Sequence, residues 1–393
     1  MAAPFHGTDL FQTDVLLTDE ERMVRDSVSR WVDERWMPIV TKHYRAGTFP
    51  RELATELGEM GLLGSSLKGY GCPGLSSSIY GLAMEELERG DSGLRSFASV
   101  QGSLCMYPIW AMGSEALKER YLPKMAAGEL IGCFGLTEPD HGSDPGGMTT
   151  KAVKDGSHYV LSGEKLWITN GSISDLAIVW AKVGGSDAAS IRGFVVDTSS
   201  KGFSAYDVEG KFSLRASVTS GLVMDEVRVP ADHLLEKSGG LKSPLSCLNQ
   251  ARYGIAWGAV GAAIACYTCA LEYAKTRVQF GKPIAGFQLV QAKLAEMISE
   301  IVKAQLLVVQ LGRLKDAGKV SPVQVSLAKR NNVRMALEIA RTAREILGAN
   351  GIADEYPVFR HMANLESVFT YEGTHDIHTL VIGREVTGLS AFA

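Results

Sequence analysis

The spacing of apolar and polar positions changes twice along the chain, and each change marks a predicted domain. In residues 1–130 the apolar positions recur at the helical period. Acidic residues in Thr18–Glu21 open a helix that continues through Trp36, because negative charge is favourable in a first helical turn. Further helices are predicted at Arg51–Leu63, Ser78–Glu88 and Ser114–Ala127. This pattern predicts an N-terminal α-helical domain.

In residues 131–237 the spacing and type of the apolar residues change. Their apolar residues are often β-branched and lie in short runs between Gly, Asn, Asp and Ser, which is typical of strands. Asp155-Gly156 favours a hairpin turn. The predicted strands are Tyr159–Ser162, Lys165–Thr169, Ala177–Val183, Ile191–Val196 and Leu222–Val229. We therefore expect a middle β domain.

A Gly-, Ser- and Pro-containing stretch, Ser238–Pro244, leads into residues 238–393, where the helical period returns over longer segments. The predicted long helices are Cys247–Arg277, Gln288–Ala317 and Pro322–Leu347, followed by the terminal segment. They predict a C-terminal four-helix bundle. Helices, then strands, then helices indicate an α+β fold with segregated layers, and not a doubly wound sheet.

Composition narrows the class of protein. The 393 residues are 46% hydrophobic and 21% charged, and the net charge is −4. Such a chain has no field that attracts nucleic acid, so we expect no nucleic-acid partner. Without 18 consecutive apolar residues we also expect no membrane span. The start lacks a secretory signal, and six irregularly placed cysteines suit a reducing compartment, so we expect a bacterial cytoplasmic or mature mitochondrial-matrix protein.

Two short motifs suggest other chemistry, and each has a plainer explanation. Cys266 and Cys269 match a C-x-x-C redox motif, but they lie in an Ala-rich helical run, where small residues serve packing. His375 and His378 could bind a metal, but the sequence offers neither a third ligand nor a typical spacing. We expect no metal.

The segment Thr370–Thr374 places Glu372 between an aromatic residue and Gly-Thr. Helical segments flank it at Met362–Phe369 and Ile377–Thr387, and the Gly disfavours one continuous helix. Glu372 is therefore expected at a helix break. A carboxyl group directed into a dry cavity there would have a raised pKa and could act as a general base. An ordinary capping or surface Glu is the alternative.

Two glycine-rich segments lie at the entrance to the β region, Phe134–Pro139 and Gly142–Gly147, and Trp167–Asn170 follows about thirty residues later. Open backbone, hydroxyl groups and an indole suit a flat or phosphorylated ligand, although each motif alone is weak. Together and in this order they closely resemble the acyl-CoA dehydrogenase family of flavoproteins over nearly the whole chain. Glu345–Gly351 resembles another family element, with Ala349 in place of the usual second Gly.

The resemblance implies FAD as cofactor and assigns its binding positions. Gly135–Asp144 would bind FAD and frame the thioester, and Trp167 with Thr169 would lie against the isoalloxazine. Arg277 and Phe280 would reach the FAD of a neighbouring subunit. The assigned positions are Phe134, Leu136, Thr137, Gly142, Ser143, Trp167, Thr169, Arg277, Phe280, Gln288, Gly348, Gly351, Thr374 and Asp376.

Four longer segments are similar to the glutaryl-CoA dehydrogenase branch of the family: Glu88–Ser99, Lys211–Ser217, Asn249–Trp257 and Tyr371–His378. In that branch the arginine matching Arg95 meets the distal carboxylate of the substrate, with Glu88 and Ser99 orienting it. Physics supports this, because a carboxylate in a dry pocket must be paired and Arg offers a planar, always-charged fork. A surface pair of Arg95 with Asp91 or Glu88 is the alternative. Asn249 and Arg252 would contact the CoA arm.

The resemblance also implies a reaction. Glu372 would remove the α-proton of the thioester while the β-hydride passes to the flavin, and loss of CO2 from glutaryl-CoA would give crotonyl-CoA. Tyr371 would tune the second step. We expect an electron-transferring flavoprotein as partner and a homotetramer. The alternatives are a dehydrogenase of short or branched monocarboxylic acyl-CoA, an acyl-CoA oxidase, and a silent acyl-CoA-binding protein.

Overall fold

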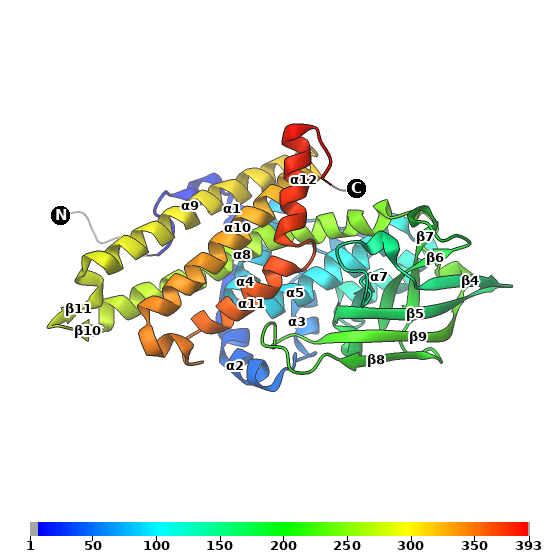
Figure 1. Cartoon of the computed structure of the whole chain (residues 1–393), viewed down its shortest axis with the longest axis horizontal. Helices are drawn as coiled ribbons and strands as arrows, with labels where there is room; N and C mark the ends of the chain where they lie inside the picture. Colours follow the sequence, from blue (N-terminus) through cyan, green and yellow to red (C-terminus); the bar gives the residue numbers. More distant parts are fainter. Residues whose placement is uncertain (1–6, 392–393) are drawn as a thin grey trace.

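The chain forms two helical regions that are separated in sequence by a β-sheet. The computed structural model describes residues 7–391. Figure 1 shows long C-terminal helices at one end of an elongated molecule and the sheet at the other. The predicted α+β class, with helical N- and C-terminal parts and a curled mixed sheet, is confirmed. The boundaries at residues 130 and 237 fall between elements and stay a prediction.

The N-terminal helices begin where the sequence supplies caps. Thr18 Oγ1 accepts a hydrogen bond from Glu21 N at 3.2 Å, and Thr18 N donates to the Glu21 carboxylate at 2.8 Å, which is a capping box. The predicted helix through Trp36 is confirmed. Its last turn, Val32–Trp36, is π-helical and leads directly into the next helix. The elements are α1 (Asp19–Trp31), α2 (Met37–Ala46), α3 (Leu53–Glu59), the hairpin β1 (Lys68–Gly69) and β2 (Cys72–Pro73), α4 (Ser77–Gly90), α5 (Ser92–Ser99), α6 (Tyr107–Met112) and α7 (Glu115–Ala126).

Helices α5 and α6 were not predicted. Every residue from Ser92 to Met106 is buried, so this stretch has no solvated face. A helix that is covered on all sides shows no alternation of polar and apolar positions, and its small polar residues hide it further. This buried segment carries Arg95.

The sheet contains seven strands. They are β3 (Gly132–Gly135), β4 (Lys151–Asp155), β5 (His158–Thr169), β6 (Leu176–Val183), β7 (Ile191–Asp197), β8 (Phe203–Asp207) and β9 (Thr219–Pro230). The order is β3-β6-β4-β5-β9-β8, with β7 also paired to β6. β3 and β4 lie parallel to β6, and the other pairs are antiparallel. The predicted hairpin turn at Asp155-Gly156 is confirmed.

The prediction of two strands within residues 159–169 is wrong, because β5 is one continuous strand. Its pairing with β9 shifts register between Leu161 and Gly163 and again between Lys165 and Ile168. Each bulge interrupts the alternation of faces, which is why the sequence pattern looked broken. The second bulge contains Trp167, at a left-handed φ of 65°. β3, β4 and β8 were not predicted.

The C-terminal region contains α8 (Lys242–Thr276), a hairpin of β10 (Val278–Gln279) and β11 (Lys282–Pro283), α9 (Gln288–Asp316), α10 (Pro322–Ile346), α11 (Val358–Thr370) and α12 (His375–Thr387). Helix α8 begins before the predicted Cys247, because Pro244 lies in its first turn, where proline is tolerated. The helices α8, α9 and α10 pack against one another, and α11 packs along α10 (Figure 1).

Helix α8 is long and apolar enough to cross a membrane by length and composition. In this fold it packs between α4 and α10, and 72% of its most apolar window is buried. Gly261 permits the contact with α4, because a Cβ there would lie 1.9 Å from the Glu85 carbonyl oxygen. The buried position is that of a core helix.

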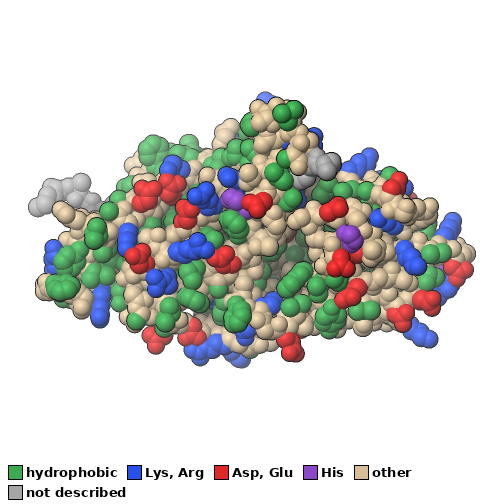
Figure 2. All heavy atoms as spheres, in the orientation of Figure 1, with side chains coloured by type: hydrophobic (Ala, Val, Ile, Leu, Met, Phe, Trp, Pro, Cys, Tyr) green, Lys and Arg blue, Asp and Glu red, His purple; other side chains and the backbone are tan. Residues whose placement is uncertain are grey.

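The two helical regions and the sheet meet around α5 and α11. In the loop between β8 and β9, Leu214 N donates to Asn364 Oδ1 on α11 at 2.8 Å. The same loop contacts the start of α5, since a Cβ on Gly93 would lie 2.3 Å from the Ala216 carbonyl oxygen. Figure 2 shows that this face is hollowed between α11–α12 and the sheet.

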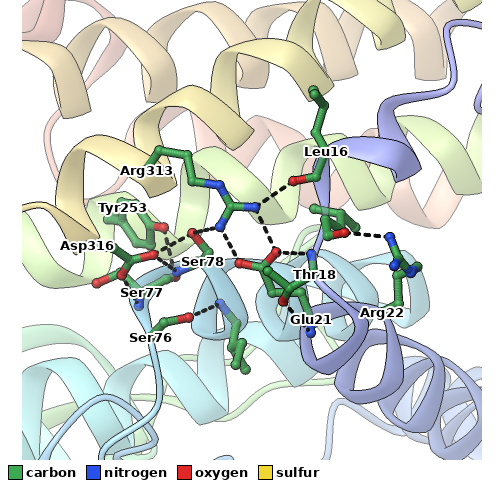
Figure 3. A network of polar contacts seen from close by, with 12 residues as sticks. Leu16, Thr18, Glu21, Arg22, Ser76, Ser77, Ser78, Tyr253, Arg313 and Asp316 are labelled. Atoms are coloured by element: carbon green, nitrogen blue, oxygen red, sulfur yellow. Dashed lines mark hydrogen bonds and ion pairs between the residues drawn. The ribbon is translucent and has the colours of Figure 1, made fainter.

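A polar network fastens the N-terminal segment to α9 (Figure 3). Arg313 pairs with Glu21 and donates to the Leu16 carbonyl oxygen at 2.8 Å and to Ser78 Oγ at 3.2 Å. Ser78 Oγ in turn donates to Asp316 at 2.6 Å. Because both carboxylates receive several hydrogen bonds, this network stabilises the junction of α1, α4 and α9.

Candidate active site

Glu372 lies at a sharp break between two helices. Helix α11 ends at Thr370, and Thr374 caps α12 by accepting from Ile377 N at 3.1 Å. The backbone between them is left-handed, with φ of 51° at Glu372 and 87° at Gly373. Glycine adopts this conformation freely, but a non-glycine residue does so at a cost of about 1 kcal/mol or more. The predicted helix break is confirmed.

The carboxyl group of Glu372, a half-buried residue, is incompletely bonded. Its Oε2 is buried and has no hydrogen-bond partner within residues 7–391. Burial raises the pKa of this carboxyl above its ordinary value, and the positive charges of Arg95, Lys329 and Arg252 oppose the rise without cancelling it. A carboxyl in that condition can accept a proton near neutral pH, which is what a general base must do. The capping or surface alternative does not describe this side chain.

Arg95 lies beside Glu372 and is fully buried. Its Nε donates to Glu88 Oε2 at 2.6 Å, and its Nη2 donates to the Tyr371 hydroxyl. Burial alone would lower the pKa of Arg95, but Glu88 and Tyr371 raise it further than burial lowers it, so the charge is retained. Nη1 makes no hydrogen bond within the described residues. The predicted group Glu88, Arg95, Tyr371 and Glu372 is thus together, and Arg95 is not a surface arginine.

Two serines on α5 differ in position. Ser99 Oγ is buried and has no partner in the described part of the chain, so its predicted role as an orienting group stays a prediction. Ser96, which the sequence reasoning missed, places Oγ 3.4 Å from the Tyr371 hydroxyl. No pattern in the sequence pointed to Ser96, because it lies on a helix that was not predicted.

Arg252 and Lys329 approach the Glu372 loop from α8 and α10. Arg252 Nε donates to the Glu372 carbonyl oxygen at 2.7 Å, and Asn249 Oδ1 lies 3.3 Å from Arg252 Nη1. Both predicted CoA-arm residues therefore adjoin the site. Lys329, which was not predicted, is only 2% exposed and donates to the carbonyl oxygens of Tyr371 and Gly373.

A buried ion pair shapes the predicted FAD loop. Lys165 Nζ lies 2.9 Å from Glu138 Oε1 and 3.1 Å from the Leu136 carbonyl oxygen. Glu138 also accepts from Thr149 N at 2.6 Å and Thr150 N at 2.9 Å. Burial would raise the pKa of Glu138, but Lys165 and these donors lower it to about 2. The pair fixes the turn after Phe134 and Leu136, which are both buried.

The neighbouring surface fits a flavin. The Trp167 indole is 59% exposed on its bulge, where a left-handed φ turns a bulky side chain outward. The hydroxyl groups of Thr137, Ser143 and Thr169 make no hydrogen bond within residues 7–391. The backbone at Gly142 is open, because a Cβ at that position would have no atom within 4 Å. An exposed ring beside unpaired hydroxyl groups and open backbone suits a flat ring with a polar tail.

Other predicted FAD positions lie elsewhere. Phe280 is 94% exposed on the β10–β11 hairpin, which Figure 1 places at the far end of the bundle, and Arg277 and Gln288 flank it. Gly348 and Gly351 lie after α10, where Asn350 donates to the Tyr273 hydroxyl at 3.0 Å. One chain does not bring these residues to Glu372. Thr374 and Asp376 lie in the first turn of α12, next to the site.

The alternative chemistries find little support. His375 stacks on Phe369 at 4.4 Å, and His378 is buried behind Gly373. Within residues 7–391 no cluster of three metal-ligating side chains is found. Burial raises the pKa of the Cys269 thiol to about 11, and that of Cys266 also rises, which disfavours the thiolates that redox exchange requires.

Comparisons with known proteins agree over the whole length. Models of the acyl-CoA dehydrogenase N-terminal, middle and C-terminal domains match residues 18–129, 133–227 and 238–387. A glutaryl-CoA dehydrogenase structure from Mycobacterium smegmatis is 56% identical, with a TM-score of 0.96, and the match covers 99% of this chain and 100% of that one. A second, in complex with FADH2, is 52% identical with a TM-score of 0.96, covering 98% and 99%.

A short-chain-specific acyl-CoA dehydrogenase from Megasphaera elsdenii is 37% identical over 94% of this chain and 98% of its own length. The family and the relative with bound FADH2 identify FAD as the cofactor, and the exposed Trp167 with its neighbouring hydroxyl groups fits it. The chain therefore belongs to the acyl-CoA dehydrogenase family of FAD-dependent oxidoreductases.

Proposed function

We propose that the chain dehydrogenates glutaryl-CoA at the Cα–Cβ bond and releases CO2 to give crotonyl-CoA. The observation that carries the proposal is Arg95, a fully buried arginine beside Glu372 whose Nη1 makes no hydrogen bond within the described residues. A ligand carboxylate entering a dry site needs such a partner, because an unpaired charge there is strongly unfavourable. The similarity to glutaryl-CoA dehydrogenases at 52–56% identity supports the same substrate.

Glu372 is the general base of the proposed reaction. Its unpartnered Oε2 accepts the proton that leaves Cα of the thioester. Trp167, Thr137 and Thr169 would hold FAD, which would supply the acceptor for the hydride from Cβ.

Decarboxylation follows from the second carboxylate. Once Cα and Cβ are joined by a double bond, the Cγ–carboxylate bond can break, and its electron pair moves into the conjugated thioester. The protonated Glu372 can return its proton to Cγ, which completes crotonyl-CoA and restores the base. Arg95 positions the carboxylate. Tyr371, whose pKa burial raises to about 12, stays protonated, so its hydroxyl accepts from Arg95 Nη2 and can donate its own proton to the same carboxylate.

A second candidate is a dehydrogenase of short or branched monocarboxylic acyl-CoA. It is favoured by the 37% identity to the short-chain-specific relative. With a monocarboxylic substrate, however, the fully buried guanidinium of Arg95 would have no carboxylate to bind. For that reason glutaryl-CoA is the better proposal.

We also propose an electron-transferring flavoprotein as acceptor and a homotetramer as the working assembly. The exposed Phe280 hairpin supports the assembly, because a ring that is 94% exposed on one chain suits contact with another copy. Mass measurement of the native protein tests the assembly. Reduction of an added electron-transferring flavoprotein tests the acceptor.

The decisive experiment supplies the purified FAD-loaded enzyme with glutaryl-CoA and an artificial electron acceptor. We expect crotonyl-CoA and CO2 in equal amounts. Release of glutaconyl-CoA would remove the decarboxylation step, and faster turnover of butyryl-CoA would favour the second candidate. Peroxide formation with oxygen as sole acceptor would indicate an oxidase.

A matched pair of variants tests the role of Arg95. Arg95→Met should lower kcat/KM for glutaryl-CoA by about 10²- to 10³-fold and that for butyryl-CoA by less than about tenfold, because a buried charge pair is lost for one substrate. Arg334→Met, on an exposed arginine of α10, is the control and should change neither. Equal losses on both substrates would contradict carboxylate pairing.

A further inference from the structure

Three consecutive carbonyl oxygens of the Glu372 loop are bound by two cationic side chains. Lys329 Nζ, on α10, donates to the Tyr371 oxygen and, at 2.7 Å, to the Gly373 oxygen. Arg252 Nε, on α8, donates to the intervening Glu372 oxygen at 2.7 Å. We call this arrangement the carbonyl clamp. The two side chains bind backbone oxygens at Glu372 and on both sides of it, and neither makes a hydrogen bond to the Glu372 carboxyl group.

The loop needs such partners. It follows the last residue of α11, so its carbonyl groups lie outside the helical hydrogen bonds, and buried carbonyl groups without donors are costly. The left-handed backbone at Glu372 also costs about 1 kcal/mol or more unless its surroundings fix it. A relaxed loop would turn the carboxyl group away from its present place.

Lys329 is an unexpected residue for this position. It is 2% exposed on a helix whose other basic residues, including Arg330, Arg334 and Arg341, are not buried. An amino group removed from water in this way is unfavourable unless it is bonded, and both of its recorded bonds are to the Glu372 loop. Its contacts therefore point to the active site.

We propose that Lys329 is a positioning residue of the active site, which with Arg252 clamps the Tyr371–Gly373 backbone so that the Glu372 carboxyl faces the reacting carbon and stays ionised. This inference rests on the proposed role of Glu372 as general base. Lys329 acts through the loop and through its charge, and it does not touch the substrate.

The charges around Glu372 give the sign of the effect. Arg95 on α5, Lys329 on α10 and Arg252 on α8 favour the carboxylate, and Glu88 on α4 opposes it. Three neutral groups also face Glu372: Tyr371, Tyr80 on α4, and His378 on α12, whose pKa burial lowers to about 3. Burial also lowers the pKa of Lys329, and Glu372 opposes that change. Removing Lys329 must therefore shift the Glu372 titration to higher pH.

Three substitutions separate charge from geometry. Lys329→Met removes the charge and both hydrogen bonds. Lys329→Gln retains a donor without the charge, and Lys329→Arg retains the charge. Infrared difference spectra against Glu372→Gln follow the ionisation of the Glu372 carboxyl directly, with no turnover required. Steady-state rates with glutaryl-CoA or butyryl-CoA give kcat and KM, and flavin absorbance gives the FAD content.

For the FAD-loaded Lys329→Met enzyme we expect kcat to fall by about 100-fold, as for a misplaced base, with KM within about threefold. The carboxyl titration should move up by about one pH unit, which is the size expected for loss of a nearby opposite charge. Lys329→Gln should show the same shift and Lys329→Arg should not. Lys303→Met, on an exposed lysine of α9, is the matched control and should match the parent in both.

A folded Lys329→Met or Lys329→Gln enzyme with the parental titration and kcat overturns the clamp. If Lys329→Met does not fold, Lys329→Gln and Lys329→Arg decide, and failure of all three to fold assigns Lys329 to stability and overturns the proposal. The proposed function fails separately, if the parent enzyme oxidises no acyl-CoA or if Glu372→Gln remains active, and the infrared titration still reports on Lys329 in that case.

Discussion

Two ionic clusters lie where helices of different regions meet. Both contain arginine and glutamate, but they serve opposite purposes. In one, Arg313 binds both carboxylate oxygens of Glu21 and links through Ser78 to Asp316 (Figure 3). In the other, Glu372 has three cationic neighbours, yet its Oε2 has no hydrogen-bond partner within residues 7–391. Both acids are surrounded by positive charge, but only one is bonded to it.

The pKa of each acid follows from this difference. Burial raises the pKa of Glu21, but hydrogen bonds from Arg313 and Thr18 lower it by more, so this carboxyl titrates below its ordinary value. Burial raises the pKa of Glu372 and its cationic neighbours do not reverse the rise, because their donors bind the loop carbonyl groups or other side chains. A satisfied acid stabilises the fold, whereas an unsatisfied one is available to a ligand.

The largest expected effect is on activity at the unsatisfied acid. Glu372→Gln should lower kcat by about 10⁴-fold, because the amide cannot accept the α-proton. The free energy of unfolding should not fall, since the neutral amide removes the cost of a buried, unbonded carboxyl. Turnover assays and urea unfolding measure both. A destabilised variant that still turns over would show that Glu372 serves the fold.

The satisfied acid should give the reverse result. Arg313→Met leaves Glu21 buried without its partner and should lower the free energy of unfolding by about 2 kcal/mol, a value reduced for the partial exposure of Arg313. Specific activity of the folded fraction should not change. Arg341→Met removes an exposed pair with Glu366 and is the control, with an expected change below about 0.5 kcal/mol. A large loss of activity in Arg313→Met would mean that the Arg313 cluster also contributes to catalysis, which would contradict the separation of the two roles.

A glycine on α8 gives a sharper test of the Arg95–Glu88 pair. A Cβ at Gly258 would lie 2.0 Å from Glu88 Oε2, and Glu88 is fully buried and cannot move aside freely. Gly258→Ala should therefore displace Glu88 and lower kcat/KM for glutaryl-CoA about tenfold more than for butyryl-CoA, in line with a loss of about 1.4 kcal/mol in pairing. Substrate competition measures the ratio.

The control for that variant is Gly383→Ala on α12, where nothing lies near a built Cβ and the backbone is not left-handed. It should leave the substrate ratio unchanged and add up to about 1 kcal/mol of helix stability. An unchanged ratio in Gly258→Ala would mean that Glu88 tolerates displacement, which would weaken the link between the pair and substrate choice.

The sequence predicted the elements whose two faces differ and missed those whose faces do not. The long helix α10 was predicted because its apolar positions recur against exposed Arg334 and Arg341. Helix α5 is buried throughout, so Arg95 was placed by family resemblance and not by periodicity. β5 was divided in two because the bulge between Leu161 and Gly163 breaks the alternation on which strand prediction depends.

Part of the site was predictable for a similar reason. The helix break at Glu372 was predicted because Gly373 and Thr374 signal it in the local sequence, and the role of Glu372 as base came from the family resemblance. Lys329 was missed, because its role depends on carbonyl groups 42 and 44 residues away. A signal was present: Lys329 follows the buried positions Val325 and Ala328 on the core side of α10. A lysine on a core face is a reason to look for its partner.

The smallest expected effect separates the two acids by pH alone. As pH falls from neutral, kcat/KM should decline first, because a general base must be ionised and the pKa of Glu372 lies above the ordinary 4.5. The stability that Glu21 and Glu138 contribute should persist at that point. Their folded pKa values lie below 4.5, so this stability is complete above 4.5 and is lost as pH falls through the folded values, about 2 for Glu138.

Parallel pH series of kcat/KM and of urea unfolding test this order. Activity should have an acid limb at a pH where the unfolding free energy is still near its plateau. Lys329→Gln should move the limb upward, because Glu372 loses a nearby cation. If activity and stability instead decline together in the parent enzyme, the limb reports unfolding, and the contrast between a bonded and an unbonded acid does not govern catalysis.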